Sequence, residues 1–150
     1  MSHHYWSIFA LIFNQEEKVL LNKRQNTWYY DGWRTLIAWH IEKEEFAKAA
    51  LVREIKEECW LIVDEKDLIY TQTLHRFSTT PWREYIDICF YVNKWIWTPT
   101  IMEPEKCTDL ERFELDNLPD YMPEENFHFL ENYKKGNIWI YTELDVRHTP

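Results

Sequence analysis

The sequence predicts a single mixed α/β domain spanning residues 1–150. A length of 150 residues is typical of one domain, and apolar β-type runs alternate along the chain with two segments of helical periodicity. The hydrophobic fraction of 45% and the aromatic fraction of 17% supply enough apolar surface for a packed core. These fractions exclude an intrinsically disordered chain.

The predicted strands are runs of apolar, β-branched and aromatic residues that are bounded by polar turns. They cover residues 5–13, 18–23, 35–40, 68–77, 84–95, 110–115 and 138–143. Because a short polar turn separates the first two runs, we expect them to form a β-hairpin.

Two segments have helical periodicity. Over residues 45–59, apolar residues from Phe46 to Ile55 recur at three- and four-residue spacing, and charged residues fill the other faces. The second helix begins after Pro123 and ends before Gly136, with basic residues in its last turn. Both segments are therefore expected to pack one apolar face against the strands.

The balance of charge restricts the partners. The chain has 17 Lys and Arg against 26 Asp and Glu, which gives a formal net charge of −9. A nucleic-acid polymer requires a basic surface, so the composition argues against such a partner. A small phosphate compound stays compatible with an acidic chain if metal ions supply positive charge.

The cysteines and the apolar runs indicate a cytoplasmic protein without a membrane segment. Cys59, Cys89 and Cys107 form no CxxC pair and are odd in number, as expected for reduced, packed thiols. The longest apolar stretch, residues 6–13, is far too short to span a bilayer. We interpret it as a strand.

The helix at residues 45–59 carries an acidic cluster. Glu54 lies three residues before Glu57 and four before Glu58, so the three carboxylates share one surface of the helix. Like charges at this spacing repel, and a hard divalent cation such as Mg²⁺ would reverse that cost because it prefers oxygen ligands. Taken alone, the cluster favours a solvated acidic face on which Arg53 pairs with Glu57.

The flanking residues add a longer pattern. From Glu45 the chain reads E-x7-R-E-I-x-E-E, and Cys59, Trp60 and Leu61 follow directly. This segment, residues 39–61, resembles the Nudix box, G-x5-E-x7-R-E-U-x-E-E-x-G-U, in which U is aliphatic. The matching residues are Glu45, Arg53, Glu54, Ile55, Glu57, Glu58 and Leu61. The resemblance extends to Tyr-Asp-Gly at 30–32 and Glu-Pro-Glu-Lys-Cys at 103–107, and so covers nearly the whole chain.

The resemblance implies an α/β/α sandwich with a mixed β-sheet and a catalytic helix at about 45–59. It also implies Mg²⁺-dependent hydrolysis, with Mn²⁺ as a substitute ion, of a nucleoside diphosphate derivative. The expected substrate is a nucleoside triphosphate, which is cleaved to the monophosphate and pyrophosphate. A homodimer is compatible with the family.

The resemblance assigns roles to the residues of the box. The expected metal ligands are the carbonyl of Trp39 and the carboxylates of Glu54, Glu57 and Glu58. Glu54 or Glu58 would also orient or deprotonate the attacking water. Arg53 is expected to hold a carboxylate in place and to pair with Glu45, and the same salt bridge is compatible with a purely structural role.

Four residues outside the box are substrate candidates. Glu103 resembles a carboxylate of nucleoside-triphosphate-cleaving members, where it acts as a distal base or at the metal site; a surface glutamate is the alternative. Tyr30, Trp33 and His75 are candidates for stacking on a nucleobase. Aromatic residues are so frequent here that core packing is the alternative for each of them.

The departures from the box fall on glycines. The chain has only two, Gly32 and Gly136, whereas about ten are usual at this length. Positions where relatives have glycine carry other residues, namely Trp28, Trp39, Glu44, Trp60 and Trp97. The pattern suggests a sequence whose glycines were replaced. It keeps open a second interpretation, a catalytically inactive or redesigned Nudix-fold nucleotide-binding module.

Overall fold

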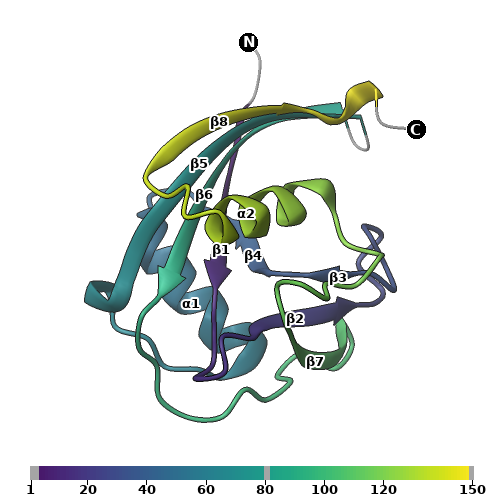
Figure 1. The fold of residues 1–150 in the computed structure, drawn as a ribbon. Coiled ribbons are helices and arrows are strands. Elements are labelled where there is room, and N and C mark those ends of the chain that lie inside the picture. Colours follow the sequence, from purple (N-terminus) through teal and green to yellow (C-terminus); the bar gives the residue numbers. More distant parts are fainter. Residues whose placement is uncertain (1–3, 80–81, 149–150) are drawn as a thin grey trace.

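The computed structural model describes residues 4–79 and 82–148. Its larger sheet has five strands in the order β4-β1-β6-β5-β8 (Figure 1). These are β4 (Ile37–His40), β1 (His4–Leu11), β6 (Trp82–Val92), β5 (Leu68–Thr79) and β8 (Ile140–Asp145). The pairs β1·β6 and β5·β8 are parallel, and the pairs β1·β4 and β5·β6 are antiparallel. The prediction of a mixed sheet is confirmed.

A second, antiparallel sheet has the order β3-β2-β7 and consists of β3 (Arg34–Thr35), β2 (Val19–Arg24) and β7 (Cys107–Phe113). The prediction of a hairpin between the first two strands is wrong for most of their length. Beyond one bridge between Phe13 and Val19, β1 and β2 enter different sheets. The reason is that β4 and β6 occupy both edges of β1.

Two helices cover opposite faces of β1. Ile8 and Ala10 pack in one core cluster with residues of α1 (Ala47–Cys59), and Phe9 and Leu11 pack in another with residues of α2 (Glu124–Lys134). Because alternate residues of a strand point to opposite faces, the two helices lie on either side of the sheet. This is the predicted α/β/α arrangement.

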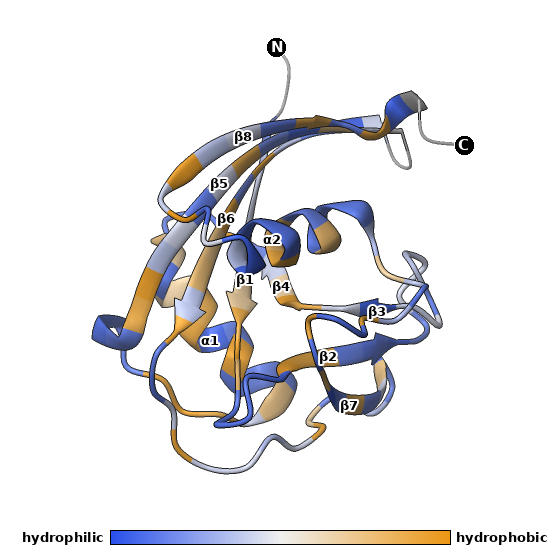
Figure 2. Cartoon of the chain, in the orientation of Figure 1, coloured by the Kyte–Doolittle hydropathy of each residue, from blue (hydrophilic) through white to orange (hydrophobic). Residues whose placement is uncertain are grey.

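Each helix is amphipathic, as expected for an outer layer: Figure 2 shows hydrophilic and hydrophobic residues side by side on both. Two short 3₁₀ helices complete the structure, η1 (Glu65–Asp67) before β5 and η2 (Val146–His148) after β8. None of the helices in the described ranges is long and apolar enough to cross a membrane.

Several turns have the backbone geometry that favours glycine. The residue after α1, Trp60, caps the helix at φ 62° and ψ 13°, and its N–H donates to the carbonyl of Lys56. Trp28, Glu44 and Trp97 also have positive φ, so four of the five glycine-like positions inferred from the sequence are left-handed. Trp39 is the exception, because it lies within the extended strand β4.

Candidate active site

The carboxylates of α1 line a pocket of about 140 Å³ between the helix, β2 and the segment before β7. Glu54 is buried, Glu57 is exposed and Glu58 is partly buried, so the cluster extends from the protein interior to solvent. The full lining is Asn22, Arg24, Thr27, Trp39, Glu42, Arg53, Glu54, Glu57, Glu58, Glu103, Lys106 and Cys107. The structure therefore brings Glu103 and Trp39 to the carboxylates of the box.

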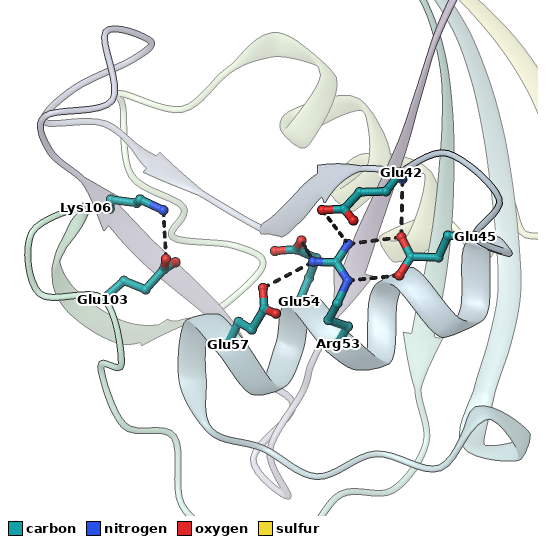
Figure 3. Close-up of polar contacts among 7 residues, drawn as sticks. All are labelled: Glu42, Glu45, Arg53, Glu54, Glu57, Glu103 and Lys106. Atoms are coloured by element: carbon teal, nitrogen blue, oxygen red, sulfur yellow. Dashed lines mark hydrogen bonds and ion pairs between the residues drawn. The ribbon is translucent and has the colours of Figure 1, made fainter.

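Arg53 organises the carboxylates around it (Figure 3). Its Nε and Nη2 donate to the two oxygens of Glu45 at 2.9 and 3.0 Å. Its Nη1 donates to Glu54 and, at 3.2 Å, to Glu57. A fourth carboxylate, Glu42, lies 3.7 Å from Nη2. Because one planar guanidinium hydrogen-bonds to the other three carboxylates, Arg53 fixes the side chains of Glu54 and Glu57 relative to Glu45.

Glu58 is held from β2 rather than by Arg53. Asn22 Nδ2 donates to Glu58 Oε2 at 3.1 Å, and Thr35 Oγ1 donates to Asn22 Oδ1 at 2.6 Å. Asn22 was not among the residues predicted from the sequence. The available signal was its position: it is a buried polar residue in the otherwise apolar beginning of β2.

The pocket is rich in carboxyl groups, with five glutamates in its lining. Burial raises the pKa of Glu54 to about 7, opposed by its hydrogen bond with Arg53. Burial, together with the neighbouring Glu54, raises the pKa of Glu58 to about 8. Several carboxylate oxygens that lie close together and are shielded from water suit a hard divalent cation as ligands. No group of three or more His, Cys, Asp or Glu in the described ranges is a ready-made metal cage, and it is Arg53 that holds Glu54 and Glu57 here.

The raised pKa values predict how stability depends on pH without metal. A carboxyl whose pKa is higher in the folded state binds protons on folding, so its stabilising effect is lost as pH rises through the folded pKa. For Glu54 and Glu58, with an ordinary value of 4.5, that loss begins near pH 4.5 and is complete above about pH 8. We expect the melting temperature in EDTA to drop by several degrees between pH 5 and 8, as measured by circular dichroism. A flat profile would contradict the burial of these carboxyls.

A second cavity of about 330 Å³ adjoins the carboxylate pocket. The two share Arg24, Thr27 and Trp39 as lining residues, so they lie next to each other. The rest of its lining is Ser7, Phe9, Trp28, Tyr29, Thr35, Leu36, Ala38, His40, Arg76, Arg83, Tyr85, Pro123, Glu125 and Asn126. A volume of this size, with aromatic walls and a few polar groups, is typical of a site for a small molecule.

Sequence comparison assigns the chain to a family. A family model described as the NUDIX domain matches residues 3–133. The chain belongs to the Nudix family. Members of this family hydrolyse pyrophosphate bonds of nucleotide derivatives and generally use a divalent metal such as Mg²⁺. No curated protein sequence matches the chain.

Solved Nudix structures share the fold. The MutT Nudix hydrolase from Burkholderia pseudomallei superposes with a TM-score of 0.78 at 20% identity, covering 87% of this chain and 98% of that one. The MutT protein from Methanosarcina mazei Go1 superposes with a TM-score of 0.72 at 20% identity, covering 91% of this chain and 96% of that one. A Nudix hydrolase from Nitrosomonas europaea superposes with a TM-score of 0.75 at 17% identity, covering 91% of this chain and 93% of that one. At identities of 17–20%, the similarity to these structures shows a shared fold.

Three predicted substrate residues of this Nudix chain lie outside both cavities. His75 bonds to Glu84 at 2.7 Å and to Tyr141 at 3.3 Å. The next residue, Arg76, lines the larger cavity, and since neighbouring residues of a strand face opposite sides, His75 points away from it. The prediction that His75 contacts substrate is not supported by this position.

Tyr30 and Trp33 pack on each other, with ring centroids 4.8 Å apart, and neither lines either of these two cavities. Tyr29 lines the larger cavity instead. Both tyrosines lie in the irregular loop between β2 and β3, and Tyr30 has a left-handed backbone with φ 52°. A loop of this kind has no regular alternation of buried and exposed residues, so the sequence does not indicate which of the two rings faces the cavity.

Proposed function

We propose that this Nudix protein is an Mg²⁺-dependent pyrophosphohydrolase that cleaves a nucleoside triphosphate to the monophosphate and pyrophosphate. The observation that carries the proposal is that the carboxylate pocket lies directly beside a larger, aromatic-walled cavity. A metal-bound triphosphate in the first and a nucleoside in the second would occupy both. Arg24, shared by the two cavities, offers a positive charge to the phosphates that lie between them.

In this proposal Glu54, Glu57, Glu58 and the carbonyl of Trp39 hold the metal. When bound, the metal neutralises charge on the phosphate oxygens and the leaving group. Glu54 or Glu58 orients the attacking water and accepts its proton. Glu103 would provide a further carboxylate at the same pocket.

Arg53 and Glu45 act as positioning residues. We expect Arg53→Lys to lower kcat about 10–100-fold, the usual cost of losing a group that orients metal ligands. An ammonium offers one point of charge and does not reproduce the fork that joins Glu45, Glu54 and Glu57. Steady-state kinetics measure the effect, with Arg147→Lys as a distant control. A kcat within twofold of wild type would remove Arg53 from the mechanism.

A second candidate is a catalytically silent nucleotide-binding module. The observation in its favour is that Arg53 already occupies oxygens of Glu54 and Glu57 and that the large side chain of Trp39 lines the pocket. Steady-state assays with Mg²⁺ or Mn²⁺ on nucleoside triphosphates and nucleoside diphosphate conjugates separate the two. Turnover that is highest with a triphosphate supports our proposal. Nucleotide binding without turnover supports the silent module.

A further inference from the structure

The lining of the larger cavity carries an excess of positive charge. It includes Arg24, Arg76 and Arg83 against one carboxylate, Glu125. The chain as a whole has a net charge of −9, and the neighbouring pocket has five glutamates in its lining. The two cavities therefore differ in the sign of their charge, and the larger one can hold a negative group without a metal ion.

The charge of Arg76 is balanced within the protein. Its guanidinium hydrogen-bonds to Asp87, its Nη2 lies 3.7 Å from Glu125 Oε1, and its guanidinium carbon lies 3.9 Å from the centroid of the Tyr85 ring. Arg76 and Asp87 are both buried, where a charge needs such partners. Two carboxylates around one guanidinium leave no net positive charge for a ligand at Arg76.

The charge of Arg83 is not balanced in this way. Its guanidinium carbon lies 4.4 Å from the centroid of the Tyr5 ring, and no carboxylate within residues 4–79 or 82–148 pairs with it. No nitrogen of Arg83 is among the described polar atoms that are both sealed from solvent and unpartnered. Its N–H groups are therefore accessible, and the positive charge of this half-buried residue is left for a ligand.

His40 packs on the same tyrosine as Arg83. The centroids of the His40 and Tyr5 rings are 6.0 Å apart, and His40 lines the cavity. Its Nδ1 hydrogen-bonds with Ser7 Oγ at 3.1 Å. Its Nε2 has no partner in the part of the chain that the structure describes and is not sealed from solvent. When Ser7 donates to Nδ1, the imidazole proton is on Nε2. Arg83 and His40, the donor pair, thus offer N–H groups to one cavity.

We propose that Arg83 and His40 bind a phosphate group carried on the 2′ or 3′ oxygen of the ribose of the bound nucleotide. This inference rests on the proposed function, because it takes the larger cavity as the nucleoside site. A guanidinium donates two parallel hydrogen bonds to a phosphate, and the imidazole N–H donates to a third oxygen. The substrate then has two anionic ends, one bound through metal ions at the glutamates and one bound directly by the donor pair.

The ribose is the part of a nucleotide that reaches the donor pair. Trp39 lines both cavities and directly precedes His40, and the centroids of these two rings are 5.8 Å apart. The donor pair thus lies beside the wall that the two cavities share. In a nucleotide, only the 5′ oxygen and methylene group separate the 5′-phosphates from the ribose ring. Phosphates in the carboxylate pocket therefore bring the ribose to this shared wall, and the base extends further into the larger cavity.

The first experiment titrates adenosine, guanosine and their 2′- and 3′-monophosphates into the protein in EDTA by calorimetry. None of these compounds has a 5′-phosphate, so the carboxylate pocket and its metal take no part. We expect a 2′- or 3′-monophosphate to bind about 10–100-fold more tightly than its parent nucleoside, in line with hydrogen bonds from a charged group. Equal binding of nucleosides and monophosphates, or binding of none of them, would overturn the proposal. Inorganic phosphate that binds as tightly as the monophosphates would contradict the ribose assignment.

The second experiment uses Arg83→Gln, with Arg147→Gln as the matched control. Arg147 also stacks on aromatic rings, those of Phe77 and Trp82, but it lines neither cavity. We expect the affinity ratio of monophosphate to nucleoside to fall to about one in Arg83→Gln and to keep its wild-type value in Arg147→Gln. Because both ligands are titrated into one preparation, partial unfolding does not change the ratio. An unchanged ratio in Arg83→Gln would refute the assignment.

These titrations separate the inference from the proposed function. Hydrolysis is assayed with Mg²⁺ and nucleoside triphosphates, whereas the binding preference is measured without metal and without a bond to cleave. Tighter binding of the monophosphates that depends on Arg83 supports the donor pair even if no triphosphate is hydrolysed. Hydrolysis by a protein that does not distinguish a nucleoside from its 2′- or 3′-monophosphate leaves the proposed function in place and contradicts the role of Arg83.

Discussion

Replacing the left-handed tryptophans with glycine is expected to raise the melting temperature by about 5–10 °C. The four positions are Trp28, Trp60, Trp97 and Trp139, with φ of 62°, 62°, 76° and 57°. An L-residue in this conformation costs roughly 1–2 kcal/mol because its Cβ crowds the backbone, and glycine removes that cost. The larger entropy that glycine gives the unfolded chain offsets part of the gain.

Side-chain packing does not oppose this change strongly. Trp28 is 100% exposed, Trp97 66% and Trp139 70%, so these three lose little buried surface, whereas Trp60 is 42% exposed and loses more. Trp39→Gly is the matched control, since Trp39 lies in a strand without positive φ. We expect it to lower the melting temperature, because glycine weakens a strand. A quadruple variant that melts no higher than wild type would contradict the strain assigned to these turns.

The variant Glu58→Gln is expected to lose activity and to gain stability. The amide keeps the hydrogen-bonding shape but removes a negative charge that burial destabilises, so the metal-free protein should gain on the order of 1 kcal/mol at pH 8. The same change removes a proposed metal ligand and the proton acceptor. We expect kcat to fall at least 1,000-fold, which corresponds to about 4 kcal/mol in the barrier.

Opposite changes in stability and activity are a specific signature. Replacing a glutamate with a purely structural role would lower the stability of the protein. Replacing a solvated glutamate would change neither the stability nor kcat. Glu65→Gln is the control, because Glu65 is an exposed glutamate in η1. Thermal melts in EDTA and kinetics in Mg²⁺ measure the two effects. A Glu58→Gln variant with wild-type kcat would exclude Glu58 from the reaction.

Local patterns predicted the elements that carry the chemistry. The helical spacing placed a helix at 45–59, and α1 begins at Ala47 and ends at Cys59. The i, i+3 and i, i+4 relations put Glu54, Glu57 and Glu58 around one pocket. Such patterns succeed because the geometry of a helix depends only on near neighbours in sequence.

Contacts between segments that lie far apart in the sequence could not be predicted from the sequence alone. The hairpin prediction failed because the edges of β1 are taken by strands that lie far along the chain. Arg83 was missed because an arginine on a protein surface is ordinary, and only the fold shows it in the wall of a cavity. Asn22 was missed for the same reason: its partner Glu58 is 36 residues away.

The central claim is that the carboxylate pocket is a metal-dependent site for cleaving a nucleoside triphosphate between the α- and β-phosphates. Phosphorus-31 NMR of GTP with the wild-type protein tests it most directly, with and without Mg²⁺ and beside Glu57→Gln. We predict signals of the monophosphate and pyrophosphate that appear only with Mg²⁺ and are lost in the variant. Release of the diphosphate and inorganic phosphate, or no turnover by the folded wild-type protein, would contradict the claim.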